Sequence, residues 1–198
     1  MINESDKFSW AIIQETLVQH FISPQRLSTI RDIFTLPNFF EGWFTVESLS
    51  ALIRRFSNIA LVSNEHFLSF SKPDIAFSYN DLTCVIEVKH LSTRDPDCRG
   101  RWNGAKQSTV AKDICALCTN QNSTVVKRVL VFYGPAYQVN HLTSESCGRN
   151  HRKQCLECSI ADLQKTVLED CDFQLSKPEC AELLRSEQGN FYLLIFTV

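Results

Sequence analysis

Hydrophobic residues recur at helical spacing along the first quarter of the chain. Apolar side chains three to four positions apart predict a helix over residues 5–21. Ser23 followed by Pro24 is typical of a helix start, because serine caps a first turn and proline fits the first helical position. We expect Pro37 to end this second helix. A third helix is predicted from Trp43 to Arg55, with these residues facing inward: Val46, Leu49, Leu52, Ile53 and Phe56.

After residue 57 the pattern changes to short segments rich in β-branched and aromatic residues. Such segments cover residues 58–62, 67–70, 73–78 and 82–90, and Tyr79-Asn80-Asp81 supplies a turn before the last of them. Because no helical pattern separates these segments, we expect about three strands that pair as an antiparallel meander.

Helices and strands alternate in the second half of the chain. Residues 106–118 predict a helix, and the near-continuous apolar run 125–133 predicts a fully buried strand closed by Gly134-Pro135. A further helix capped by Ser159 follows, and residues 191–198 predict a last strand.

This order of elements predicts one α/β domain over residues 1–198, with a mixed central sheet flanked by helices. Residues 1–42 would form a helical N-terminal extension. Residues 137–158 show little periodicity, and we expect a loop-rich insertion there.

The composition is that of an ordinary globular protein and excludes a disordered chain, with 44% hydrophobic and 21% charged residues. The polar N-terminus does not predict a secretory signal, and the longest apolar run, Phe191–Phe196, is too short to span a bilayer. We therefore expect an intracellular protein, cytoplasmic or nuclear, with no membrane partner. The net charge of −2 does not favour a nucleic-acid partner, but a local basic groove is enough to bind phosphates.

The strand expected at residues 82–90 carries two charged residues on one face. Alternate side chains of a strand share a face, so Glu87 and Lys89 stand together, opposite Cys84 and its apolar neighbours. Asp74 comes directly before the preceding apolar segment. If the turn at Tyr79–Asp81 pairs the two strands, Asp74 can lie beside Glu87.

Two neighbouring carboxylates are suited to Mg²⁺ or Mn²⁺, since hard cations prefer oxygen ligands. Such an ion can polarise a phosphodiester oxygen and lower the pKa of water, while Lys89 could orient the attacking water and offset developing charge. The alternative interpretation is an ordinary surface ion pair between Glu87 and Lys89, with Asp74 only beginning a turn.

Pro73-Asp74, an intervening turn and Glu87-Val88-Lys89 resemble the motif of the PD-(D/E)XK nuclease superfamily. The family core runs helix, three-stranded meander, helix and strand, which resembles the order expected from Trp43 to Tyr133. The resemblance implies a restriction-endonuclease-like fold in which Asp74 and Glu87 bind a divalent metal and Lys89 completes the site. It also implies a metal-dependent nuclease, with DNA as the expected substrate.

The resemblance extends to residues in the flanking helices. Many members carry a Glu on the helix before the meander, for which Glu47 is the first candidate here and Glu41 the second. Some branches carry a Gln early in the next helix, where Gln107 stands, but the Tyr that should follow four residues later is Ala111. The basic residues expected to contact backbone phosphates are Arg99, Arg101 and Lys106.

The sequence does not decide two further properties, which are the catalytic activity of the domain and its oligomeric state. A domain that keeps the nuclease fold without catalysis, and binds nucleic acid or protein partners, is the alternative function. A homodimer or a larger protein complex is compatible with the sequence.

Three of the nine cysteines and one histidine form a C-x3-H-x3-C-x2-C pattern. Cysteine and histidine are the preferred ligands of Zn²⁺, and a metal would order a loop-rich insertion. The four candidate zinc ligands are Cys147, His151, Cys155 and Cys158. The alternative is that these are incidental thiols in a cysteine-rich chain. The pair Cys115 and Cys118 falls within a predicted helix, where packing is the expected role.

Overall fold

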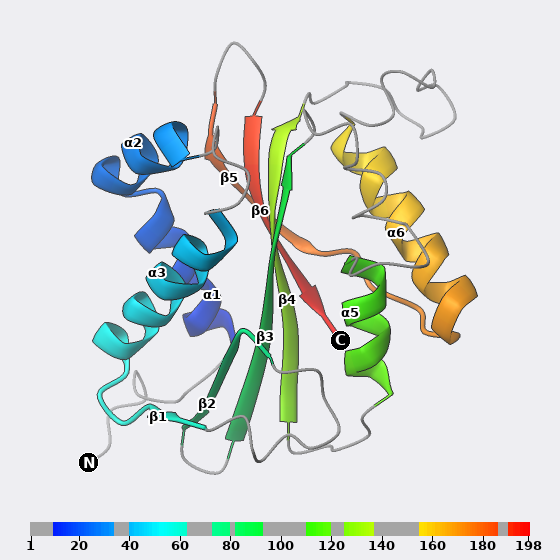
Figure 1. Cartoon of the computed structure of the whole chain (residues 1–198), viewed down its shortest axis with the longest axis horizontal. Coiled ribbons are helices and arrows are strands. Elements are labelled where there is room, and N and C mark those ends of the chain that lie inside the picture. Colours follow the sequence, from blue (N-terminus) through cyan, green and yellow to red (C-terminus); the bar gives the residue numbers. More distant parts are fainter. Residues whose placement is uncertain are drawn as a thin grey trace.

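The computed structural model describes residues 10–33, 40–62, 73–79, 82–92, 110–119, 125–136, 155–185 and 190–198, and shows one mixed sheet between two groups of helices (Figure 1). The elements, in chain order, are α1 (Trp10–Phe21), α2 (Pro24–Ile33), α3 (Phe40–Arg55), β1 (Ala60–Leu61), β2 (Ile75–Tyr79), β3 (Leu82–Ser92), α5 (Val110–Cys118), β4 (Val125–Ala136), α6 (Leu156–Cys171), β5 (Glu179–Leu184) and β6 (Asn190–Thr197). None of the helices within these ranges combines the length and the apolar character that a membrane crossing requires.

The six strands follow the order β1-β2-β3-β4-β6-β5 across the sheet. β1, β2 and β3 pair antiparallel, which confirms the expected meander. β3 and β4 pair parallel, which requires a crossover connection such as the one that contains α5. β6 then pairs antiparallel with both β4 and β5. The sheet is therefore mixed and flanked by helices, as the sequence predicts.

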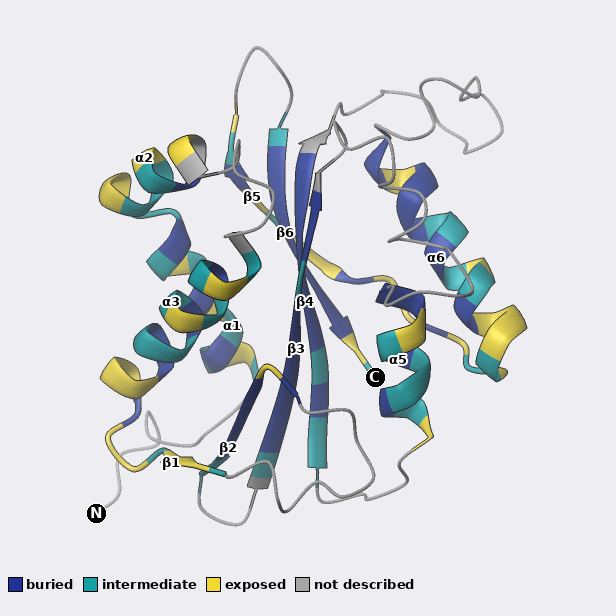
Figure 2. Ribbon diagram, in the orientation of Figure 1, coloured by how far each residue is buried: buried dark blue, intermediate teal, exposed yellow. Residues whose placement is uncertain are grey.

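A separate hydrophobic core lies on each face of the sheet, because side chains alternate along each strand. Figure 1 shows helices on both sides of the sheet, and Figure 2 shows its central strands coloured mostly as buried. On one face, α1 and α3 pack against Ile86 and Val88 of β3. On the other face, α5 and α6 pack against Val85 and Leu91 of the same strand. Leu17 of α1 is fully buried in the first core, so the N-terminal helices belong to the body of the domain.

The buried face of α3 agrees only in part with the expected one, since Leu52 and Phe56 are buried as predicted. Val46 is 65% exposed and Ile53 is 45% exposed, so the prediction that they face inward is wrong. The helix instead buries Phe44, whose ring lies 4.4 Å from that of Phe21 and 4.3 Å from that of Phe132. The aromatic contacts of Phe44 contribute to the rotation of this helix about its axis and leave Val46 and Ile53 outside the core.

The start of α6 corrects two further expectations. Its N-cap is Cys155, which makes no side-chain capping hydrogen bond, whereas Ser159 lies inside the helix and its hydroxyl is 2.8 Å from that of Tyr133. The prediction that Ser159 caps the helix is therefore wrong. Because α6 begins at Leu156, the expected loop-rich insertion does not extend to residue 158.

Two strands also differ from the sequence prediction. β4 continues to Ala136, past Gly134-Pro135, through a register shift opposite β6. Gly134 has φ +157°, and a Cβ there would lie 2.7 Å from Phe191, which explains why glycine stands at this irregularity. β5, which the sequence analysis missed, is an edge strand with half of its residues exposed and no β-branched residue, so it lacks the usual strand pattern. The strand expected at residues 67–70 lies outside the described residues.

Candidate functional site

The candidate site lies where β3 continues beyond the end of β2. The pairing of the two strands ends at Ile75 and Ile86. β3 runs on to Ser92 and stays paired with β4 over this length, up to Gly134. Within the described part of the sheet, β3 therefore has an open edge from Glu87 onward, and side chains from other elements can reach it there.

Asp74 lies at this open edge, directly before β2. Continuing the β2–β3 register by one residue brings Asp74 opposite Glu87. The Val88 backbone N–H donates a hydrogen bond of 2.8 Å to Asp74 Oδ2. Val88 is buried, so its N–H needs an acceptor once β2 has ended, and the Asp74 carboxylate supplies one. The expectation that Asp74 lies beside Glu87 is met.

Four carboxylates surround the Lys89 ammonium group. The distances from Lys89 Nζ are 3.3 Å to Glu41 Oε1, 3.3 Å to Asp113 Oδ2, 3.5 Å to Glu87 Oε2 and 4.0 Å to Asp74 Oδ2. The Lys89 side chain is only 20% exposed. We call these five residues the Lys89 cluster. It contains more acidic groups than its one cation can neutralise.

The cluster gathers residues from both faces of the sheet. Glu41 is in the first turn of α3 and Asp113 in the first turn of α5, and these helices pack on opposite faces. Both can approach Lys89 because no described strand covers the edge of β3 at this point. The early end of β2 therefore creates the site.

Burial and crowding change the pKa values in the cluster. Burial, followed by the nearby charge of Asp74, raises the pKa of Glu87 to about 8. Burial also raises the pKa of Glu41, against the lowering effect of Lys89. For Lys89, burial acts to lower the pKa, but the surrounding carboxylates, first among them Asp113, outweigh it and raise the pKa. The cluster thus keeps Lys89 charged and disfavours simultaneous ionisation of its acids.

Two carboxylates of the Lys89 cluster could bind a hard cation that keeps most of its water ligands. Among the described residues, no group of three or more His, Cys, Asp and Glu side chains is arranged to hold a metal ion. Two carboxylates are nevertheless adjacent, at Asp74 and Glu87, and Mg²⁺ commonly uses one or two carboxylates and keeps several waters. Burial first and the nearby charge of Asp74 second raise the pKa of Glu87, and a divalent cation between the two carboxylates would oppose the effect of Asp74. These two residues could hold such an ion.

Glu47, the first candidate for the helix glutamate, lies elsewhere. Its Oε2 atom is 2.8 Å from His20 Nε2 and 2.9 Å from an Arg26 guanidinium nitrogen, and its side chain is 14% exposed. Glu41, six residues earlier on the same helix, is the one beside Lys89. The structure therefore brings the second candidate, Glu41, to Lys89 and directs Glu47 to other partners, because a helix turns by about 100° per residue and the two carboxylates leave it in different directions.

Asp113 is the member of the cluster that the sequence analysis missed. It stands beside the apolar stripe of α5 formed by Val110, Ile114 and Leu117. An acid at the edge of a buried stripe and in a first helical turn was the available signal. It is a weak one, because acids at helix N-termini are common without any ligand.

Several expected site residues lie outside the described residues. They are Gln107, Arg99, Arg101, Lys106, Cys147 and His151. Of the four candidate zinc ligands, Cys155 and Cys158 are described; both are buried, and the Cys155 thiol lies 3.5 Å from Glu157 Oε2.

Cys115 and Cys118 of α5 contact a third thiol. Both pack against the core beside α6 and interact with the side chain of Cys171, the last residue of that helix. Burial raises the pKa of both thiols to about 12, so neither is an activated nucleophile. Packing between the two helices is the role that this arrangement supports.

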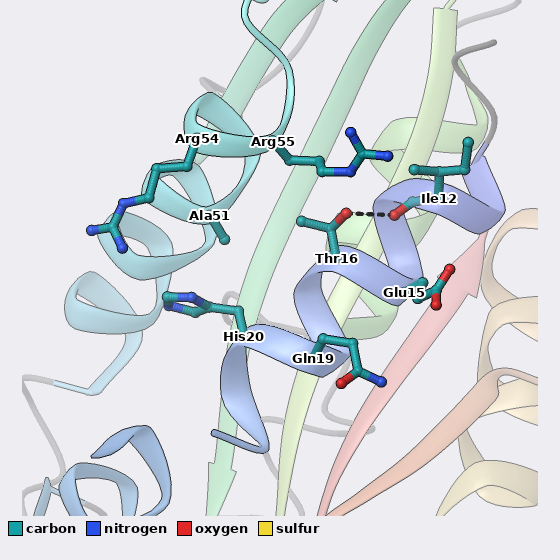
Figure 3. A pocket seen from close by; sticks show the side chains of 8 residues that line it. All are labelled: Ile12, Glu15, Thr16, Gln19, His20, Ala51, Arg54 and Arg55. Carbon is teal, nitrogen blue, oxygen red and sulfur yellow. Dashed lines mark hydrogen bonds between the residues drawn. The ribbon is translucent and has the colours of Figure 1, made fainter. Parts of the chain in front are cut away.

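A pocket of about 720 Å³ lies apart from the cluster, between α1 and the end of α3 (Figure 3). It is lined by Ile12, Glu15, Thr16, Gln19, His20, Ala51, Arg54 and Arg55. The imidazole of His20 is engaged with Glu47. The pocket shares no residue with the Lys89 cluster and has no pair of adjacent carboxylates, so it does not offer the same chemistry.

Comparison of the chain with protein-family models, with curated proteins and with solved structures found no match.

Proposed function

We propose that this protein is a divalent-metal-dependent nuclease that hydrolyses phosphodiester bonds of DNA. The observation that carries the proposal is the position of Lys89 beside the adjacent carboxylates of Asp74 and Glu87. Isolated acidic pairs and lysines are common. Two carboxylates and an ammonium group in contact, on an open strand edge, are the groups that metal-assisted phosphodiester hydrolysis requires.

The element order supports a restriction-endonuclease-like fold. α3, the meander of β1 to β3, α5 and β4 follow one another in the order expected for the PD-(D/E)XK core. The motif residues also lie at corresponding places, with Asp74 directly before β2 and Glu87 and Lys89 on β3. Fold and motif therefore point to the same family, although each alone would be a weaker argument.

The proposed mechanism assigns one task to each residue. Asp74 and Glu87 would hold Mg²⁺ or Mn²⁺, which polarises a phosphodiester oxygen and lowers the pKa of water when bound. Lys89, kept positively charged by its neighbours, offsets the negative charge that develops on the phosphate during attack. Glu41 holds Lys89 from the α3 side. Arg99, Arg101 and Lys106 are proposed to contact the DNA backbone.

The rival function is a nuclease-like domain that binds DNA or a protein without cleaving. In that case the Lys89 cluster would serve only as an ion-pair network that stabilises the fold. Asp74 would then act only as the acceptor of the hydrogen bond from the Val88 N–H. An ion-pair network of this kind is also compatible with a stable fold.

A cleavage assay separates these two functions. The purified protein is incubated with plasmid DNA, linear duplex DNA, single-stranded DNA or RNA, in Mg²⁺, Mn²⁺ or a chelator. The nuclease proposal predicts products on DNA that need the metal and are absent with the Asp74→Asn variant. DNA binding without cleavage, under all metal conditions, would favour the non-catalytic domain.

A further inference from the structure

Asp113 approaches Lys89 from the same face of β3 as the Lys89 side chain itself. Side chains alternate along β3, and Val85 and Leu91 pack against α5 on the face that also carries Glu87 and Lys89. The two charged residues therefore lie between apolar residues covered by α5. Asp113, in the first turn of that helix, supplies the carboxylate directed at them.

The Asp113 carboxylate forms an ion pair with Lys89. Its Oδ2 atom is buried and forms no hydrogen bond within the described part of the structure, while it lies 3.3 Å from Lys89 Nζ. The Asp113 side chain is 15% exposed. A buried carboxylate oxygen without a hydrogen bond is costly unless an opposite charge compensates it, and Lys89 is the cation in contact.

The four carboxylates around Lys89 do not have the same task. In the proposed function, Asp74 and Glu87 share their charge with a divalent cation. Glu41 and Asp113 then remain as the partners that hold the ammonium group, one from α3 and one from α5. These two contacts cross the sheet edge from opposite sides, so together they restrict the direction of the flexible Lys89 side chain.

We propose that Asp113 is a positioning residue that orients Lys89 toward the phosphate bound at Asp74 and Glu87. This inference rests on the proposed nuclease function and adds a residue to it. Asp113 touches neither substrate nor metal in this account. Its effect on catalysis is exerted through the Lys89 ammonium group alone.

The first test compares Asp113→Asn with a matched control, Asp162→Asn, which makes the same change at a half-buried aspartate of α6. We expect Asp113→Asn to lower kcat by about 10- to 100-fold, because misplacing a catalytic group by an ångström has effects of this size. KM for DNA and Mn²⁺ affinity, measured by electron paramagnetic resonance, should stay within about twofold of wild type, and Asp113→Glu should recover part of kcat. Asp162→Asn should leave all of these unchanged.

A purely structural role of Asp113 predicts a different result. Loss of the acid from the first turn of α5 would then lower the melting temperature and reduce Mn²⁺ affinity and kcat together. That joint loss, or an Asp113→Asn variant with wild-type kcat, would overturn the proposal.

The second test does not depend on activity. The order parameters of the Lys89 Cε and Nζ groups are measured by NMR relaxation in wild type, Asp113→Asn and Asp113→Glu. We expect Lys89 to be ordered in wild type, clearly more mobile in Asp113→Asn and ordered again in Asp113→Glu. Unchanged order in Asp113→Asn would refute the positioning role. If wild type fails to cleave any nucleic acid, the nuclease function fails, while this measurement still decides whether Asp113 holds Lys89.

Discussion

Asp74 Oδ2 accepts a hydrogen bond of 2.8 Å from the backbone N–H of Val88, across the point where β2 has ended and β3 continues. The side chain thus takes the place of a missing strand neighbour and fixes the Asp74 carboxylate beside Glu87. This contact has a structural function in any case. A decisive substitution must keep this hydrogen bond while it removes the charge that the proposed metal site needs.

Asp74→Asn and Asp74→Ala are predicted to differ in stability but not in activity. The Asn side chain keeps an oxygen that can accept the Val88 N–H, so its free energy of unfolding should stay close to wild type. The Ala variant leaves this buried N–H without its acceptor and should lose about 1–3 kcal/mol. Both should lose metal-dependent cleavage. Chemical denaturation and a cleavage assay test this, and an active Asp74→Asn variant would contradict the proposed role.

The metal-free protein is predicted to lose stability as pH rises from about 4.5 to about 8. Burial and Asp74 raise the pKa of Glu87 from 4.5 to about 8 in the folded state. Across this window the unfolded chain releases the proton while the folded chain keeps it, so the free energy of unfolding falls with increasing pH. Glu87→Gln cannot titrate and should flatten this part of the profile.

Chemical denaturation at several pH values, in the presence of a chelator, measures the effect. Comparison of the two proteins cancels the titration of groups that do not interact with Glu87. Identical slopes for wild type and Glu87→Gln between pH 5 and 8 would show that Glu87 is not held in the crowded environment described.

Glu41 and Glu47 provide a matched pair on one helix. Glu41→Gln should reduce cleavage at least about tenfold, because it removes a charge that contacts Lys89. Glu47→Gln should instead lower the free energy of unfolding by about 1–3 kcal/mol, since it weakens charged hydrogen bonds to His20 and Arg26, and should leave the activity of the folded protein intact. If Glu47→Gln reduced cleavage and Glu41→Gln left it intact, Glu47 would be the site residue.

The sequence was sufficient for the part of the site that lies on adjacent strands. Strand alternation places Glu87 and Lys89 on one face, and a short turn brings Asp74 to them, so local geometry determines all three positions. The choice between Glu41 and Glu47 depends on how α3 is rotated against the sheet. That rotation follows from the contacts of Phe44 with Phe21 and Phe132, which no local pattern reveals.

Tertiary packing also explains the other differences between the sequence prediction and the structure. Asp113 joins the cluster only because β2 ends early and α5 packs over β3, both of which are tertiary features. β5 lacks the β-branched and alternating pattern of a strand, because an edge position with exposed side chains does not require it. The sequence therefore predicts elements with strong periodicity and residues that are close in strand register. Tertiary packing determines the other site residues and the edge strand.

The candidate zinc ligands give a prediction that is independent of the nuclease site. If Cys147, His151, Cys155 and Cys158 bind Zn²⁺, protein purified without chelators should contain about one zinc per chain, lost in a Cys155→Ser/Cys158→Ser variant. Cys115→Ser, in the packing cluster of α5, is the control that should retain the metal. Elemental analysis that finds no zinc in wild type would favour incidental thiols.

The central claim is that Asp74, Glu87 and Lys89 act together in metal-dependent cleavage. The most direct measurement is the single-turnover rate of DNA cleavage in Mg²⁺ for Lys89→Met, with Mn²⁺ affinity measured on the same sample and Glu47→Gln as the folded control. We predict a rate at least about 100-fold below wild type with the metal still bound, because Lys89 stabilises developing charge without holding the ion. A Lys89→Met variant that cleaves DNA at the wild-type rate would contradict the account.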